Sequence, residues 1–355
     1  MKRMIKKSVV ILLTLALVGG TLGGCGNDKS DKNETTQVET TADDLTDDEI
    51  ETETDEVNDS VENRQIQYSY STKEEGLEYL LSNEEFFAGF TQNDLDFKMQ
   101  KKDANMEEYM EFAKEQILDF TEEEKQAIDE IMDYIEVRLD EEGFTLPDIG
   151  PIVLINTTQK EESNSAAYTH GTQIFLNAEY IASPDIGMYG RILMAHELFH
   201  CLTRNDPEFR KEMYKIIHFT VQDEDFELPP SVLEYYINNP DVEHHNSYAT
   251  FTINGEKIDC FTAMITTKHF ENEGEYILDN ATTALVPIDG SDTYYLPEDA
   301  SDFYEVFGHN TEYVVDPEEC MADNFSYAVI YGIDGSTGQG YASPEIIKGI
   351  IYNLK

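Results

Sequence analysis

Residues 195–201 read AHELFHC, a stretch in which His196 and His200 flank Glu197. Residues four apart lie on the same face of an α-helix, so both imidazoles can reach a single metal ion. Glu197 follows the first histidine, from where its longer side chain can reach a metal-bound water without binding the metal. Because so short a pattern also occurs by chance, it indicates a metal site only if the chain supplies a third protein ligand.

The sequence on either side of this stretch favours an α+β fold, with the histidine-bearing helix beside a small β-sheet. Apolar residues flank the motif over residues 189–203 and predict a helix that is buried on its other side. Two earlier segments, residues 151–156 (PIVLIN) and 171–177 (GTQIFLN), are rich in strand-forming residues. Residues 248–298 combine Thr, Ile, Val and Tyr with turn signals, and they read as further strands and loops.

Helices are predicted at both ends of the folded part. Residues 74–141 follow a helical pattern, and Thr121 with Glu124 fits a capping box at the start of the clearest helix. The apolar positions of that helix recur at spacings of three and four and predict a core face: Ile128, Ile131, Ile135 and Leu139. Further helices over residues 316–332 and 343–354 make the C-terminal part mostly helical.

Two acidic residues compete for the role of third ligand. Asp206 stands where the longer motif HExxHxxGxxH has its last ligand, but Thr203 replaces the glycine that this motif needs for a sharp turn. Asp206 also precedes Pro207 and suits the N-cap of the next helix. The other candidate is Glu319, which lies 119 residues after His200 in the stretch PEECMADNF. An acid there also suits the start of a helix for electrostatic reasons alone.

The second stretch carries a resemblance to a known family. A HExxH motif followed on a later helix by ExxAD resembles the gluzincin group of zinc metallopeptidases. The resemblance implies a zincin-like fold in which His196, His200 and Glu319 bind one zinc ion, and Asp323 holds His196 in its metal-binding tautomer. Two imidazoles and one carboxylate independently make a ligand set with one open position. The resemblance covers the two short motifs and the strand–strand–helix order before the first.

The expected activity is zinc-dependent hydrolysis of peptide bonds, in which Glu197 is the general base that accepts a proton from the attacking water. Sites of this kind add a donor to the oxyanion, and the candidates are His245 or Tyr248, with His244 and His309 also nearby in the sequence. The architecture of the family implies that residues 171–177 form the sheet edge that pairs with an extended peptide substrate.

Two other functions stay open at this point. The chain can keep a zincin-like fold and bind a peptide or protein ligand without catalysis, or it can hydrolyse a non-peptide amide. Glu197 argues against the first alternative, because a purely structural zinc site needs no base beside it. The sequence does not separate peptides from other amides.

Residues 1–24 resemble the signal peptide of a bacterial lipoprotein. Four basic residues come first: Lys2, Arg3, Lys6 and Lys7. A short apolar run follows, and residues 22–25 read LGGC. LGGC resembles a lipobox, in which Cys25 receives the lipid and becomes the mature N-terminus, whereas an ordinary secretory signal is the alternative. The resemblance predicts a protein on the outer face of the cell membrane, held there only by its lipid anchor.

Residues 25–65 are predicted to be an acidic, disordered tether. Between Asp28 and Glu62 there are 15 acidic residues against two lysines, and residues 26–65 contain no aromatic residue. So little apolar surface cannot offset the loss of chain entropy on folding. The folded domain is therefore expected over residues 66–355, with a helical part at 66–145 and a catalytic part at 146–355.

The charge and the cysteines exclude several classes of function. The chain has 24 basic and 73 acidic residues, a formal net charge of −49, which argues against nucleic acid and against broad adhesion to anionic lipid. Apart from Cys25, the cysteines are three in number: Cys201, Cys260 and Cys320. They allow at most one disulfide and include no C-x-x-C pair, so neither a disulfide scaffold nor a cysteine zinc site is expected.

Overall fold

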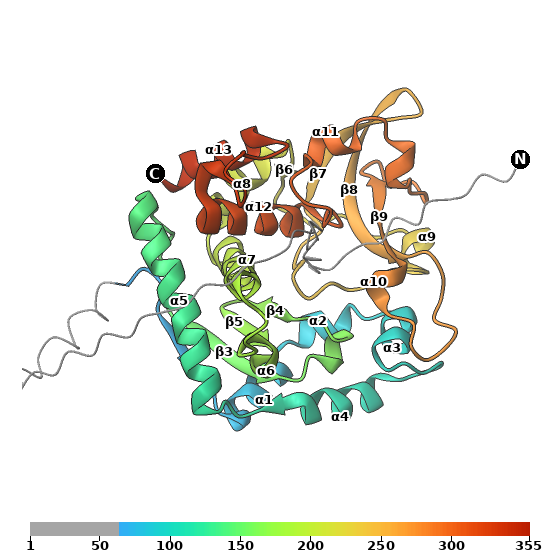
Figure 1. Ribbon diagram of the computed structural model, residues 1–355. Helices are drawn as coiled ribbons and strands as arrows, with labels where there is room; N and C mark the ends of the chain where they lie inside the picture. Colours follow the sequence, from blue (N-terminus) through green and yellow to red (C-terminus); the bar gives the residue numbers. More distant parts are fainter. Residues whose placement is uncertain (1–63) are drawn as a thin grey trace, which may run out of the picture. The chain divides into compact units, whose positions relative to one another are not determined.

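The computed structural model describes residues 64–355 (Figure 1). The predicted signal peptide at 1–24, the lipidation of Cys25 and nearly all of the predicted tether lie outside the described residues. Among the described residues, no helix has the length and apolar character that crossing a membrane requires. Cys201, Cys260 and Cys320 are buried free thiols.

The predicted α+β class is confirmed, because helices surround two separate small sheets. The first sheet has the strand order β1-β3-β5-β4, with a short β2 paired to β3. Its strands are β1 (Tyr68–Tyr70), β2 (Ile117–Leu118), β3 (Ile152–Thr157), β4 (Ala167–His170) and β5 (Gln173–Leu176). β1, β3 and β5 are parallel, whereas β4 runs antiparallel to β5. The continuous apolar run of β3 reflects its almost complete burial.

The prediction that residues 171–177 form the edge of this sheet is wrong. The segment does form β5, but β5 lies between β3 and β4. The strand at the edge next to β5 is β4, which the sequence reading missed. A four-residue strand whose side chains are all buried shows no alternation of polar and apolar residues, so it lacks the pattern by which an edge strand is recognised.

The second sheet is antiparallel, with the order β6-β7-β8-β9. Its strands are β6 (Thr220–Val221), β7 (Ser247–Ile253), β8 (Glu256–Thr266) and β9 (Ala281–Pro287). β7 and β8 are joined by Asn254 and Gly255, both with positive φ (52° and 87°), as a two-residue hairpin turn requires. The strands predicted between residues 248 and 298 are thereby confirmed.

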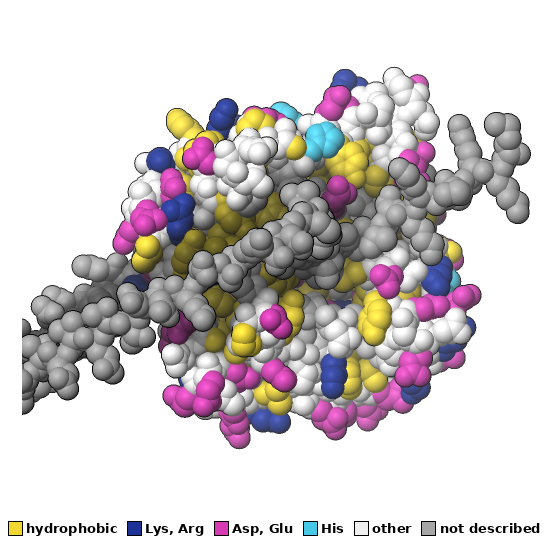
Figure 2. All heavy atoms as spheres, viewed as in Figure 1, with side chains coloured by type: hydrophobic (Ala, Val, Ile, Leu, Met, Phe, Trp, Pro, Cys, Tyr) yellow, Lys and Arg dark blue, Asp and Glu magenta, His cyan; other side chains and the backbone are white. Residues whose placement is uncertain are grey.

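The helices of the N-terminal part are α1 (Lys73–Ser82), α2 (Glu84–Ala88), α3 (Gln92–Lys98), α4 (Met106–Gln116) and α5 (Glu122–Glu142). Helix α5 matches its prediction closely. Thr121 and Glu124 form the capping box, Gly143 ends the helix with φ 66°, and the predicted apolar face is buried. On the face shown in Figure 2, acidic side chains spread over these helices with basic ones scattered among them.

The C-terminal part contains two long helices that pack together, α7 (Met188–Asn205) and α12 (Pro317–Tyr331). The others are α6 (Ala178–Ile181), α8 (Pro207–Ile216), α9 (Pro230–Leu233), α10 (Ile277–Asn280), α11 (Phe303–Phe307) and α13 (Pro344–Leu354). In Figure 1, α7 lies between α12 and the first sheet. Phe199 of α7 packs on Phe325 of α12 with ring centroids 5.3 Å apart. This packing brings the two sequence motifs together.

Candidate metal centre

Helix α7 presents His196 and His200 on one face, as their spacing predicts, and both side chains are buried. Their ring centroids are 4.7 Å apart and the rings are nearly perpendicular. Glu319 of α12 reaches between them. Its Oε2 atom lies 3.1 Å from Nε2 of His196 and 3.6 Å from Nε2 of His200. The three predicted ligands are therefore together, although 119 residues separate the second histidine from the glutamate.

Each histidine is oriented by a carboxylate on its other ring nitrogen. Nδ1 of His196 lies 2.9 Å from Oδ1 of Asp323, the contact that the gluzincin resemblance implies. Nδ1 of His200 lies 2.9 Å from Oε1 of Glu318, which the sequence reading missed. Carboxylates in this position fix the ring and leave Nε2 for a metal.

The donors of this cluster fit a divalent metal ion. One ligand atom each from His196, His200 and Glu319 lie within 4.8 Å of one another in a buried group. Nε2 of His200 is buried and has no hydrogen-bond partner among the described residues, so this nitrogen is available to bind a metal ion. Two imidazole nitrogens and one carboxylate oxygen are a set that zinc takes in catalytic sites.

The electrostatics of the cluster agree with this fit. Burial acts to lower the pKa of His196, but its hydrogen bonds to Asp323 and Glu319 outweigh burial and raise the pKa to about 10. Burial acts to raise the pKa of Glu319, but the two histidines hold it well below its usual range. The negative charge of Glu319 thus favours protons on the two imidazoles. A bound metal cation would take the place of these protons.

Glu197 lies beside the cluster and points to the edge strand. Its Oε2 accepts a hydrogen bond of 2.8 Å from the hydroxyl of Thr169 on β4. Burial raises the pKa of Glu197, although the two neighbouring histidines act to lower it. A buried carboxylate with a raised pKa is suited to accept and release a proton near neutral pH.

The carboxylate of Asp241 also lies at the site. Asp241, Glu197 and His200 form a second buried group of possible metal ligands, and one ligand atom from each lies within 4.8 Å of the others. Oδ1 of Asp241 accepts a hydrogen bond of 2.7 Å from the main-chain N–H of Thr169. Burial raises the pKa of Asp241, and the charge of Glu197 raises it further. The sequence around Asp241, NNPD, shows only turn-forming residues, so it carried no signal for this position.

The remaining oxygen of Glu319 is held from the opposite side. Oε1 accepts hydrogen bonds from Nδ2 of Asn239 at 2.5 Å and from the hydroxyl of Tyr313 at 3.1 Å. The Tyr313 ring also lies nearly parallel to that of His196, with centroids 6.3 Å apart. Tyr313 and Glu319 line a cavity of ≈ 80 Å³ together with His196 and Glu197. This cavity gives the cluster a space in which to receive a ligand.

Several candidates from the sequence lie elsewhere. Asp206 caps α8 by accepting from the N–H groups of Glu208 and Phe209, so its structural interpretation is confirmed. His245 contacts the hydroxyl of Tyr236 at 2.9 Å, and Tyr248 lies on β7 against Phe226. Neither side chain lines the cavity beside the metal group, so neither is an oxyanion donor in this arrangement.

The two remaining histidine candidates from the sequence, His244 and His309, also lie away from the cavity. His244 is exposed and pairs with Asp225 at 3.1 Å. The ring of exposed His309 stacks on Tyr304, with centroids 5.3 Å apart.

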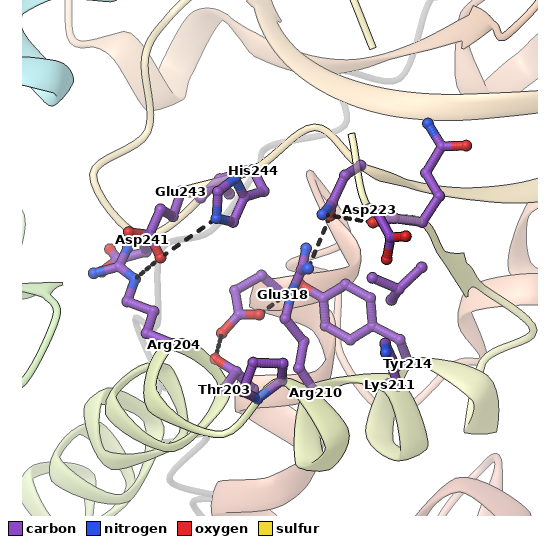
Figure 3. A pocket seen from close by; sticks show the side chains of 15 residues that line it. Thr203, Arg204, Arg210, Lys211, Tyr214, Asp223, Asp241, Glu243, His244 and Glu318 are labelled. Carbon is purple, nitrogen blue, oxygen red and sulfur yellow. Dashed lines mark hydrogen bonds and ion pairs between the residues drawn. The ribbon is translucent and has the colours of Figure 1, made fainter. Parts of the chain in front are cut away.

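A second polar cavity, of ≈ 250 Å³, lies on the far side of Glu318 (Figure 3). In this view the carboxylate of Glu318 lies between Thr203 and Tyr214, whose hydroxyls donate to it at 2.6 Å and 2.5 Å. Burial raises the pKa of Glu318, but the hydrogen bond and charge of His200 outweigh burial and keep the pKa below its usual value. Glu318 is therefore an anion with three donors, one of which is His200.

No protein-family model, no curated protein and no solved structure matches this chain.

Proposed function

We propose that this protein is a zinc-dependent peptidase with a zincin-like catalytic part. The observation that carries the proposal is the position of Glu319, whose Oε2 faces Nε2 of both His196 and His200 from a different helix. Glu197, the residue between the histidines, adds a carboxylate that is not one of these three donors. A metal site that is only structural has no need of that carboxylate, whereas hydrolysis requires a base.

The fold around the site supports a zincin-like interpretation. The helix with both histidines packs beside a small sheet whose edge strand, β4, runs antiparallel to its neighbour. The third donor comes from α12, which packs against the other side of α7. This is the arrangement that the gluzincin resemblance implies.

The chain's own residues account for the steps of hydrolysis. When bound, zinc would supply a Lewis acid that polarises the substrate carbonyl and makes water more acidic. Glu197 accepts the proton from the attacking water and passes it to the leaving amine. Thr169 orients Glu197 through its 2.8 Å hydrogen bond. Asp323 and Glu318 keep Nε2 of the two histidines directed at Glu319.

The hydroxyl of Tyr313 is our candidate for stabilising the developing oxyanion, in place of His245 and Tyr248. It lies 3.1 Å from Oε1 of Glu319 and its side chain lines the cavity beside the cluster. The phenolic O–H donates to Glu319, and from this position beside the cavity it can instead donate to an anion that forms there.

The open edge of β4 is where an extended peptide would bind. Thr169 directs its main-chain N–H and C=O away from β5, since Asp241 and Arg204 take them. Residues two apart in a strand direct these groups to the same side. Ala167 therefore offers its N–H and C=O along the cavity, where they can pair with a substrate backbone.

We propose that the enzyme acts outside the cell on peptides or proteins. This rests on the signal-like residues 1–24 and on Cys25 as the lipid-bearing residue, which lie outside the described part. The lipid anchor would be its contact with the membrane, and nucleic acid is not an expected partner at a net charge of −49.

Zinc content and peptide cleavage test the proposal. The purified protein should bind one zinc ion and cleave peptides. Glu197→Gln should keep the zinc and lose cleavage by about 100-fold or more. Glu319→Ala should lose zinc affinity. The matched control is Glu208→Gln, because Glu208 is an exposed residue on α8. A protein that binds zinc but cleaves nothing would instead be a binding module, and one that binds no zinc would contradict the proposal.

A further inference from the structure

The cavity beside the metal group is closed at one end by residues 237–241, which we call the wall segment. Its residue Asp241 accepts from the N–H of Thr169 at 2.7 Å. Arg204 donates to the main-chain oxygen of Pro240 at 2.5 Å and also to that of Thr169. The outward main-chain groups of Thr169 are thus occupied. A peptide that pairs with β4 at Ala167 cannot continue along the strand past this point.

The wall segment is anchored firmly on its other side. The N–H of Asn238 donates to Asp94 of α3 at 2.8 Å, and its side-chain amide donates to the main-chain oxygen of Phe86 in α2 at 2.7 Å. The N–H of Ile237 donates to the main-chain oxygen of Met264 in β8 at 3.0 Å. Because three different elements hold it, the segment is a fixed boundary of the site and not a lid.

The last residue of the wall segment, Asp241, places its carboxylate beside the metal group. It is nine-tenths buried, and a carboxylate oxygen lies within 4.8 Å of ligand atoms of both Glu197 and His200. In a peptide, the amine nitrogen of a residue lies about 2.5 Å from the carbonyl carbon of the same residue. The water that Glu197 holds attacks the carbonyl carbon of one substrate residue. The amine nitrogen of that same residue is then within reach of Asp241.

The charge at the closed end favours a cation. Five buried carboxylates surround the site: Glu197, Asp241, Glu318, Glu319 and Asp323. A divalent metal and Arg204 offset only part of this charge. The N–H groups of Arg204 that form hydrogen bonds go to main-chain oxygens, and its Nε lies 3.9 Å from Glu243. A carboxylate of the substrate would thus be repelled by the carboxylate of Asp241, whereas an ammonium group of the substrate would form an ion pair with it.

The positive charge of the lysine that lines the same cavity is already neutralised. Lys98 lines the cavity, but its ammonium lies 2.5 Å from the carboxylate of Glu162 in a buried ion pair. The cavity therefore offers no free cation for a C-terminal carboxylate among its described lining residues.

We propose that Asp241 binds the protonated amino terminus of the substrate, so that the enzyme removes single residues from the amino ends of peptides. The inference rests on the peptidase function proposed above. Water adds to the first peptide carbonyl, the bond from that carbonyl carbon to nitrogen breaks, and the proton goes to the leaving amine. The products are one free amino acid and a peptide that is shorter by one residue.

Blocking the substrate's amino terminus tests this directly. A peptide library with free amino termini and the same library after N-acetylation are incubated with the zinc-loaded full chain, and mass spectrometry maps the cuts. We expect loss of the first residue from free peptides and no cleavage of acetylated ones. Internal cuts in both libraries would overturn the inference and leave the peptidase function standing. Zinc-loaded protein that cuts neither library would overturn the peptidase function itself.

Asp241→Asn assigns the effect to one side chain. Asparagine keeps the acceptor for Thr169, so the variant should fold, as circular dichroism and zinc content will show. We expect kcat/KM for free peptides to fall about 10- to 150-fold, the range for a lost hydrogen bond to a charged group. Glu243→Gln is the matched control, since Glu243 is a half-exposed acid two residues away. A variant that gains activity on acetylated peptides would show that Asp241 blocks the site instead of binding substrate.

A binding measurement separates recognition from catalysis. In zinc-loaded Glu197→Gln, the best-cleaved peptide should bind at least about 10-fold more tightly than its acetylated form by calorimetry. Adding Asp241→Asn should remove that difference. Equal affinity for the two forms in Glu197→Gln would overturn the assignment of Asp241.

Discussion

Replacing Glu318 by glutamine tests the part of the metal centre that is seen only in three dimensions. Its carboxylate accepts from Nδ1 of His200 at 2.9 Å, from Thr203 at 2.6 Å and from Tyr214 at 2.5 Å. A glutamine side chain has one carbonyl oxygen with two acceptor positions, and its amide adds two donors. At least one of the three donors then loses its acceptor, and the negative charge beside His200 disappears.

The size of the effect follows from these contacts. One buried donor without an acceptor costs about 1–3 kcal/mol of folding free energy. A lost carboxylate partner of a metal-binding histidine lowers metal affinity by about 10- to 100-fold, or about 1.4–2.7 kcal/mol. Glu318→Gln should therefore remain folded while binding zinc more weakly, and Tyr214 and Thr203 should hold the side chain at position 318 close to its present place.

The assay is competition for zinc with a chromophoric chelator near neutral pH, with circular dichroism to show that the variant is folded. Glu208→Gln is the control, because the Glu208 side chain is 81% exposed and forms an ion pair with Lys211 on the same exposed helix face. A folded Glu318→Gln protein that binds zinc as tightly as the wild type would refute the assignment of Glu318 as the residue that orients His200.

Three further outcomes are expected. Asp323→Asn should weaken zinc binding by about 10- to 100-fold in the same chelator competition, because His196 loses its carboxylate partner. Asp206→Ala should lower the free energy of unfolding by about 1 kcal/mol through loss of the α8 cap, with zinc content unchanged; lost zinc would restore Asp206 as a ligand. Burial raises the pKa of Glu161 from its usual 4.5 to about 7, so the folded state keeps a proton that the unfolded chain releases. The free energy of unfolding therefore falls as pH rises between these values, and Glu161→Gln should remove about 3 kcal/mol of that fall in urea titrations; an unchanged pH slope would contradict this.

Local patterns in the sequence predicted much of the secondary structure. The Thr121–Glu124 capping box, the apolar face of α5 and the glycine at position 143 all appear in the structure. These features act within a few residues of one another, so they are readable without knowing the fold. Four short strands, β1, β2, β4 and β6, were not predicted, because strands of two to four residues seldom show a period.

The edge strand shows where local reading fails. Residues 171–177 were correctly read as a strand but were assigned the edge position, which β4 takes. Sheet order is decided by which strands pair, and pairing depends on connections and packing far along the chain. The same holds for Tyr313, the oxyanion donor that we propose: it faces the cluster because the chain before α12 passes beside His196.

In the candidate metal centre, residue type and spacing singled out His196, Glu197 and His200, because ligand chemistry and helix periodicity are local and general. Glu319 and Asp323 were assigned by the resemblance of their stretch to the second gluzincin motif. The contributions of Glu318, Thr169 and Asp241 emerged only from the folded chain. Each of them acts through a hydrogen bond or charge across elements that meet by packing of α7 against α12 and β4. A solvated acid and a buried acid are identical in sequence, and only burial against specific partners gives one of them a role.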